Sequence, residues 1–177
     1  MSSFHAVFVC TGNRFRSPLA AALFRQESER LGAEVDVESY GLLDLEGSGV
    51  LDEARVFGTA LGVDLGTHRS RPLRAGGLEQ ADLVVGFERA HVATAVVDAG
   101  ARRGVAFTLP ELVRLLGEAP LGSTQARERV QAAAARRSER DVPEVEDPLG
   151  RPRRRQEELA ERVAELTRTL ARQLFTG

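Results

Sequence analysis

The stretch AVFVCTGNRFRSP, residues 6–18, decides how the chain is expected to fold. Its first four residues are apolar, which is typical of a buried β-strand. The strand ends in Cys10, and a short loop then leads through Arg16 to Ser17-Pro18. Serine caps helices and proline suits their first turn, so this pair predicts a helix start. The N–H groups of such a loop and helix face one small volume, which favours an anion.

These residue types favour attack of a thiolate on a bound phosphate. A helix start and a nearby arginine both stabilise the thiolate of Cys10, and Arg16 offers a planar fork that can bind two phosphate oxygens. Ser17 can donate a hydrogen bond to the sulfur and so make it a better leaving group. Gly12 and Asn13 tolerate the left-handed backbone that a tight loop needs. The alternative, an inert buried cysteine beside a solvated arginine, is disfavoured by the combined pattern.

Residues 9–18 resemble the active-site loop of the low-molecular-weight protein tyrosine phosphatases, in which Cys, five residues and Arg-Ser follow the first strand. The family also includes protein-arginine phosphatases and related arsenate reductases. The resemblance covers most of the chain and implies one α/β domain over residues 1–177, with a four-stranded parallel sheet in the order 2-1-3-4. It implies that phosphate is bound by the loop residues Thr11, Gly12, Asn13, Arg14, Phe15 and Arg16.

The rest of the chain alternates between strand-like and helix-like segments, which predicts a parallel sheet with helices on both faces. Further strands are expected at residues 35–39, 81–87 and 105–107. Helices are expected at residues 19–31, 50–61, 88–97, 110–116, 123–137 and 156–175. The last carries an apolar stripe suited to packing on the sheet, which we prefer to a membrane-surface role because its polar face mixes Glu and Arg.

Asp147-Pro148 is the second candidate for chemistry. Cleavage of a phosphomonoester needs an acid that protonates the leaving oxygen. In the family that the chain resembles, the aspartate of an Asp-Pro pair late in the chain is this acid, and Asp147 matches it. Pro148 would bias the backbone of Asp147 toward an extended conformation. An ordinary Asp-Pro turn is the alternative. Glu146 is the substitute acid.

Two further segments allow two interpretations each. His68 lies in a segment that resembles one whose histidine supports the family's loop through hydrogen bonds; the alternative is a solvated basic loop. The arginines of residues 151–155 either lead into the last helix as a charged segment or attract an anionic protein substrate.

The sequence departs from the family pattern at four places. Phe15 replaces a second cysteine, so no disulfide with Cys10 can form. Arg14 stands where tyrosine-specific members have an aliphatic residue and arginine phosphatases have threonine. Ala21 replaces a frequent glutamate, and Leu149-Gly150 stands where aromatic residues often line the cleft, which would weaken stacking on a phosphotyrosine ring.

Composition sets the remaining expectations. The 177 residues, 42% of them hydrophobic, suffice for one core, and a net charge of −2 argues against nucleic-acid or membrane partners. No signal peptide or membrane span is apparent, and the absence of lysine excludes a Walker A loop. The single cysteine suits a reducing cytoplasm. We expect no metal or other cofactor, and a monomer.

The leading hypothesis is a phosphomonoester hydrolase, a protein tyrosine phosphatase that forms a cysteinyl-phosphate, with Cys10, Arg16, Asp147 and Ser17 in the catalytic roles above. Its substrate would be a phosphorylated protein or a small phosphomonoester. Protein-arginine phosphatase is an alternative specificity. Arsenate reduction would need an external thiol, because the chain has one cysteine. A phosphate-binding module without catalysis is the non-enzymatic alternative.

Overall fold

The structure is a computed structural model that describes residues 3–118, 125–138 and 142–177. Its sheet consists of the strands β1 (Phe4–Cys10), β2 (Val35–Gly41), β3 (Leu83–Gly86) and β4 (Ala106–Thr108). All paired strands are parallel, and their order is β2-β1-β3-β4. The predicted α/β class, parallel sheet and strand order are therefore confirmed.

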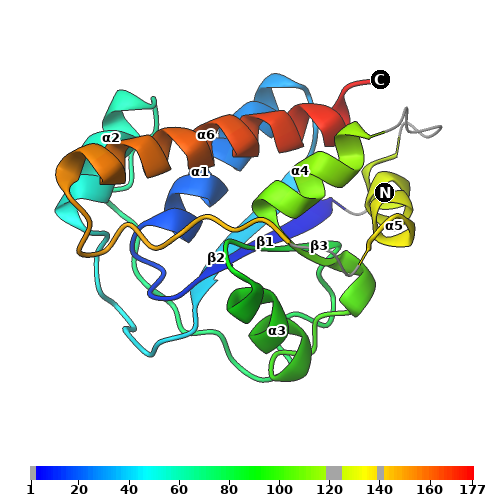
Figure 1. Ribbon diagram of the computed structural model, residues 1–177, viewed down its shortest axis with the longest axis horizontal. Coiled ribbons are helices and arrows are strands. Elements are labelled where there is room, and N and C mark those ends of the chain that lie inside the picture. Colours follow the sequence, from blue (N-terminus) through cyan, green and yellow to red (C-terminus); the bar gives the residue numbers. More distant parts are fainter. Residues whose placement is uncertain (1–2, 119–124, 139–141) are drawn as a thin grey trace.

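Helices cover both faces of this sheet (Figure 1). The elements are α1 (Arg16–Arg30), α2 (Asp52–Ala60), α3 (Arg89–Val97), α4 (Leu109–Gly117), α5 (Ala126–Ala135) and α6 (Arg153–Phe175), with a short 3₁₀ helix, η1 (Arg103–Val105). In Figure 1 α6 lies across α1 and α4, and α3 lies on the opposite side of the sheet. Among the helices of the described ranges, none is long and apolar enough to span a bilayer.

Strand β1 is the centre of the core. Phe4, Ala6 and Phe8 face the larger apolar cluster, which includes buried residues of α1, α4 and α6. Val7 and Val9 face a smaller cluster that includes residues of α3. This alternation buries both faces of the strand, as a parallel sheet with helices on either side requires.

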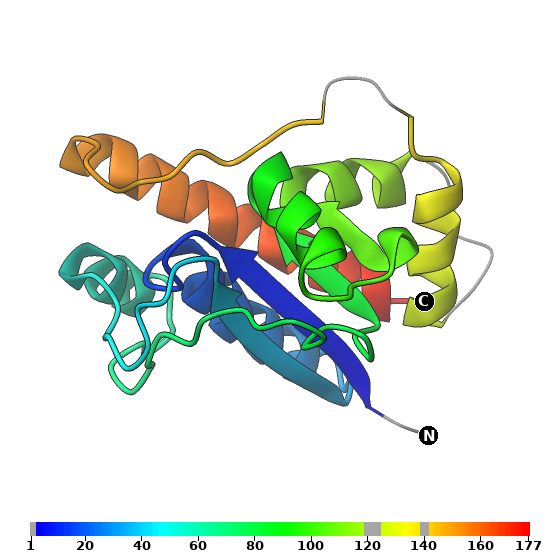
Figure 2. The same cartoon turned by 90° about the horizontal axis from the view of Figure 1, so that it is seen from below.

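The loops that contain the candidate catalytic residues lie at the carboxyl ends of the strands. β1 ends at Cys10 and β3 at Gly86. Because β2 and β3 lie on either side of β1, the loop after β1 starts at the point where the strand order reverses, the usual ligand site of such sheets. Figure 2 shows this loop and the segment that leads into α6 at the same end of the molecule.

Helix boundaries differ from the predictions by a few residues. α1 begins at Arg16, and Phe15 is its N-cap without a side-chain hydrogen bond, so the expectation that Ser17 caps this helix is wrong. α6 begins at Arg153, directly after the extended Pro152. Residues 123 and 124 of the predicted helix 123–137 lie outside the described residues, and α5 occupies residues 126–135 of it.

Gly41 brings the end of β2 against the loop after β1. A Cβ atom added to Gly41 would lie 2.8 Å from the carbonyl carbon of Gly12 and 2.9 Å from the backbone nitrogen of Asn13. Neither contact can be relieved by turning a side chain, because both atoms belong to the backbone. Glycine at this position therefore sets how closely the loop approaches β2.

Gly41→Ala is expected to lower the free energy of unfolding by about 2 kcal/mol, because the backbone must shift to relieve the overlap. Gly104→Ala is the matched control, since a Cβ at Gly104 meets no atom within 4 Å. Urea denaturation of the three proteins checks this. Equal losses in both variants would contradict the close-packing explanation.

Candidate active site

Cys10 lies at the bottom of a small cavity at the end of β1. Its side chain is 2% exposed, and its Sγ lies 3.0 Å from Ser17 Oγ and accepts the N–H of Asn13 at 3.3 Å. The cavity is about 100 Å³, a volume suited to a group as small as phosphate. It is lined by Cys10, Thr11, Gly12, Arg14, Phe15, Arg16, Leu43, Leu45, Leu51, Asp147 and Leu149.

Asn13 holds the loop in shape from behind. It is the non-glycine residue with a positive φ, 53°, among the described residues, and it is fully buried. Its Nδ2 donates to Ser17 Oγ at 2.8 Å and to Ser39 Oγ at 2.9 Å, and its Oδ1 accepts the N–H of Arg71 at 2.9 Å. Five of the six predicted phosphate-binding residues line the cavity, and Asn13 instead supports the loop from the protein side.

The Ser17 hydroxyl is oriented by these contacts. Because Asn13 Nδ2 donates to Ser17 Oγ, the hydroxyl proton is left for Cys10 Sγ at 3.0 Å or the Tyr40 carbonyl oxygen at 3.4 Å. The shorter contact is the one to sulfur, where a donated hydrogen bond stabilises a thiolate. Ser17 thus lies where the leaving-group role needs it, although it does not cap the helix.

His68 and Ser70 hold the carbonyl side of the loop. His68 Nε2–H donates to the Asn13 carbonyl at 2.8 Å, and Ser70 Oγ donates to the Gly12 carbonyl at 2.9 Å. Burial lowers the pKa of His68, and the charges of Arg71 and Arg69 lower it further, against the hydrogen bond to Asn13. Of the two loop residues that tolerate a left-handed backbone, Asn13 adopts it and Gly12 does not.

Arg16 is the buried cation of the site. Its residue is 1% exposed, and its Nη1 donates to Glu88 Oε1 and to the Val145 carbonyl, the latter at 2.8 Å. Its Nη2 lies 3.0 Å from Asp147 Oδ2 and 3.4 Å from Thr11 Oγ1. The guanidinium therefore joins three segments of the chain that are far apart in sequence.

The segment that bears Asp147 is anchored to the ends of two strands. The Val145 N–H donates to the Phe87 carbonyl at 2.8 Å, after β3, and Thr108 Oγ1, at the end of β4, donates to the Pro143 carbonyl at 2.8 Å. Asp147 Oδ1 accepts the Leu149 N–H at 3.0 Å, and its side chain is 41% exposed. The carboxyl group is thus held in a turn and is open to the cavity.

Glu146 points to other partners. Its carboxylate pairs with Arg155 at 2.6 Å and with Arg151 at 3.2 Å, whereas Asp147 pairs with Arg16. Two of the arginines of residues 151–155 therefore share Glu146 as a partner, and Arg155 also pairs with Glu158 at 3.2 Å. Arg153 lies over the Phe57 ring at 5.4 Å.

Two residues that follow β3, Glu88 and His91, also contact the loop, and the sequence did not predict them. Glu88 neutralises Arg16, and His91 Nε2 lies 3.0 Å from Thr11 Oγ1. His91 Nδ1 accepts the N–H groups of Phe87 and Glu88, both at 3.1 Å, so Nε2 carries the proton and donates to Thr11. Burial, and then the Arg16 charge, lower the pKa of His91 to about 4. Glu88 and His91 follow a buried strand directly, at the sheet edge where Cys10 was expected. This position could have identified them as candidate site residues.

The rim of the cavity is aliphatic and basic. Leu43 and Leu149 are exposed there, by 50% and 66%. Arg14 Nε donates to the Gly49 carbonyl at 2.7 Å, which holds the side chain on the rim. Phe15 is buried against Phe57, with ring centroids 6.2 Å apart, so its ring belongs to the core. No Trp occurs in the sequence, and the aromatic side chain lining this part of the described structure is Phe15.

Comparison with known proteins places this geometry among phosphatases. The family described as "Low molecular weight phosphotyrosine protein phosphatase" matches residues 5–121. A protein-arginine-phosphatase of Bacillus subtilis is 36% identical over 109 residues, 60% of this chain and 71% of that protein. A low molecular weight protein-tyrosine-phosphatase of Streptomyces coelicolor is 34% identical over 95 residues, 51% and 56% of the two chains. The crystal structure of a YwlE mutant from Bacillus subtilis superposes with a TM-score of 0.75 at 31% identity and covers 97% of this chain and 99% of that one.

His91 makes stability depend on pH. Its pKa is about 4 in the folded protein and about 6.5 in the unfolded chain, so between these values the unfolded chain binds a proton that the folded protein does not. The contribution of His91 to the free energy of unfolding is complete above about pH 6.5. It falls by up to about 3 kcal/mol as the pH is lowered toward 4. His91→Asn, which cannot be protonated, is expected to flatten this part of the stability curve.

Urea unfolding at pH 7.5, 5.5 and 4.5 measures the effect. His5→Gln is the control, because His5 lies at the far end of β1 and pairs with Glu38. The lowered carboxyl pKa values of Glu38 and Asp82 are common to wild type and His91→Asn, so the difference between these two proteins isolates the effect of His91. The same pH dependence in wild type and His91→Asn would refute the role of His91.

Proposed function

The chain belongs to the low molecular weight phosphotyrosine protein phosphatase family, and we propose that it hydrolyses phosphorylated protein through a cysteinyl-phosphate formed on Cys10. The observation that carries this proposal is the combination of one buried thiol with Arg16 and Asp147 around the same small cavity. A nucleophile, a bidentate cation and an acid are the groups that phosphoryl transfer by this route requires.

In the first step, Cys10 Sγ attacks phosphorus and the bond from phosphorus to the leaving oxygen breaks. Arg16 and the loop N–H groups hold the three equatorial oxygens, and Asp147 gives its proton to the leaving oxygen. Without substrate, Asp147 pairs with Arg16 at 3.0 Å. A phosphate that binds Arg16 takes the place of Asp147 there and leaves the carboxyl group available to the leaving oxygen.

In the second step, water attacks phosphorus, the bond from sulfur to phosphorus breaks, and Asp147 accepts the proton of the water. The departing sulfur becomes a thiolate again, stabilised by Ser17 Oγ and the Asn13 N–H. Glu88 acts as a positioning residue, because it binds Nη1 of Arg16 and leaves the Nη2 side toward the cavity. Cofactor-free and metal-free turnover follows from this scheme, since Arg16 and the N–H groups supply the positive charge.

We propose phosphotyrosine as the substrate group and phosphoarginine as the second candidate. The matching family and the Streptomyces coelicolor relative support the first. The Bacillus subtilis relative supports the second. The leucines of the rim suit an aliphatic phosphoarginine chain as well as a ring and so do not decide between the two. The ratio of kcat/KM for one peptide carrying either group decides between them.

We also propose that the protein acts in the cytoplasm, as a monomer. A catalytic thiolate needs a reducing compartment, and Cys10 has no second cysteine that could protect it as a disulfide. Light scattering at micromolar concentration tests the monomer, and cell fractionation tests the location.

Hydrolysis of para-nitrophenyl phosphate, with EDTA present, is the first test. Wild type is expected to turn over, and Cys10→Ser to lose at least about 10⁴-fold in kcat, because a serine hydroxyl is a far weaker nucleophile at neutral pH. Full activity in Cys10→Ser would refute the thiol mechanism. Thiol-dependent formation of arsenite from arsenate without phosphate turnover would favour the reductase, and phosphate binding with neither reaction would favour the binding module.

Asp147→Asn tests the acid. The variant is expected to lose about 10²- to 10⁴-fold in kcat toward an alkyl phosphate, whose leaving oxygen needs a proton, and less toward para-nitrophenyl phosphate. Glu146→Gln is the matched control and should retain activity, because Glu146 faces Arg151 and Arg155. A reversed result, with Glu146→Gln inactive and Asp147→Asn active, would reassign the acid.

A further inference from the structure

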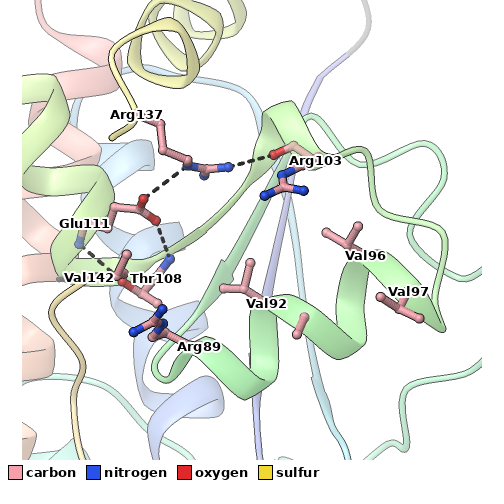
Figure 3. A pocket seen from close by; sticks show the side chains of 10 residues that line it. Arg89, Val92, Val96, Val97, Arg103, Thr108, Glu111, Arg137 and Val142 are labelled. Atoms are coloured by element: carbon pink, nitrogen blue, oxygen red, sulfur yellow. Dashed lines mark hydrogen bonds and ion pairs between the residues drawn. The ribbon is translucent and has the colours of Figure 1, made fainter. Parts of the chain in front are cut away.

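A second and larger cavity lies behind α3, apart from the residues that line the Cys10 cavity (Figure 3). Its volume is about 370 Å³, within the range of pockets that bind small molecules. It is lined by Arg89, Val92, Ala93, Val96, Val97, Arg103, Thr108, Glu111, Arg137 and Val142. Nothing in the proposed reaction uses this cavity.

One side of the cavity is apolar. Val92, Val96 and Val97 follow one another along α3 in Figure 3, and Val97 is 79% exposed. Val142, from the segment that leads to Asp147, also lines the cavity. An apolar ligand would remove these side chains from water, which is favourable in proportion to the area covered.

The opposite side contains an ion pair that needs no ligand. Glu111 is 4% exposed, and its Oε1 accepts from Arg137 Nε at 3.1 Å while its Oε2 accepts the Thr108 N–H at 3.3 Å. Arg137 also donates to the carbonyls of Arg103, at 3.1 Å, and Ala106, at 2.6 Å. Its guanidinium lies over the Phe107 ring at 4.1 Å. Both charges are thus satisfied within the protein.

The guanidinium groups of Arg89 and Arg103 are different. Within the described ranges, neither makes a side-chain hydrogen bond or ion pair; the contacts of these residues come from the Arg89 N–H, which donates to Glu144 Oε1 at 2.6 Å, and the Arg103 carbonyl. Of the nearby carboxylates, Glu144 accepts the Arg89 N–H and Glu111 is paired with Arg137. The lining therefore carries two cations whose donors are available, next to an apolar wall.

We propose that this cavity is an effector site for a small molecule with one acidic group and an apolar body. The acidic group binds Arg103, whose planar fork suits a carboxylate, and the apolar body covers Val92 and Val96. A cavity of this size with an apolar wall and few polar groups is typical of small-ligand sites.

Occupancy of the cavity is coupled to catalysis through α3. Arg89 and Val92 face the cavity, whereas Glu88 and His91, their neighbours in sequence, bind Arg16 and Thr11. Val142 belongs to the segment that the Arg89 N–H and Thr108 Oγ1 hold, and this segment leads to Asp147. A ligand that touches both α3 and Val142 holds the acid segment in place, so its binding raises kcat/KM.

The test uses 4-phenylbutyrate as the probe and 4-phenylbutan-1-ol as its uncharged counterpart. Calorimetry of the full chain is expected to show binding of the carboxylate, at least about tenfold weaker binding of the alcohol, and a similar loss for Arg103→Gln. Arg30→Gln, an exposed arginine at the end of α1, is the control and should bind as wild type does. In wild type the probe should raise kcat/KM about twofold or more, and in Arg103→Gln it should not.

Each other outcome overturns the proposal. Equal affinity for acid and alcohol, or unchanged affinity in Arg103→Gln, removes the role of the arginines. Competition with inorganic phosphate places the probe in the Cys10 cavity. Binding behind α3 without a change in kcat/KM refutes the effector role. The activation rests on the proposed phosphatase function, but calorimetry does not, so failure of the phosphatase assay and failure of this site are distinguishable.

Discussion

The site depends on a buried guanidinium and the groups that neutralise it. Burying an unpaired charge costs many kcal/mol, and removal of one partner of a buried pair costs about 3 to 5 kcal/mol. Arg16 is 1% exposed and meets this constraint with Glu88, Asp147 and the Val145 carbonyl. These partners come from the end of β3 and from the segment before α6. The burial of Arg16 is therefore coupled to the placement of Asp147 beside the Cys10 cavity.

Helix α3 is held against the loop that contains Arg16. His91 is 1% exposed and reaches the Thr11 hydroxyl with Nε2 because Nδ1 accepts two backbone N–H groups at the helix start. A Cβ at Gly86 would lie 2.8 Å from His91 Cβ, so glycine lets the helix approach the strand end. The helix that orients the loop on one side thereby forms the wall of the arginine-lined cavity on its other side.

Local patterns predicted the α/β class and the parallel sheet, and the family resemblance supplied the strand order. The apolar run before Cys10 and the Ser-Pro pair after it predicted a strand, a loop and a helix in that order. The alternation of strand-like and helix-like segments predicted the parallel sheet. They did not predict Glu88 or His91, because these meet Arg16 and Thr11 across separations of 72 and 80 residues. Ser17 was wrongly expected to cap the helix for a different reason, which lies within the loop itself. Its hydroxyl is engaged by Asn13 and Cys10, and that tertiary contact overrides the serine preference for N-caps.

The rim bears on substrate choice through two opposing effects. Leucines 43, 45, 51 and 149 line the entrance and accept an aromatic or an aliphatic group with little discrimination, because apolar contact is not directional. Arg14 does discriminate: the Gly49 carbonyl holds it on the rim, and its cationic side chain opposes the guanidinium part of a phosphoarginine, whereas a phosphotyrosine ring carries no such charge. Repulsion between like charges near a partly buried site exceeds the difference between two apolar contacts. The charge of Arg14, rather than aromatic stacking, is thus the feature of the rim that supports the proposal of phosphotyrosine.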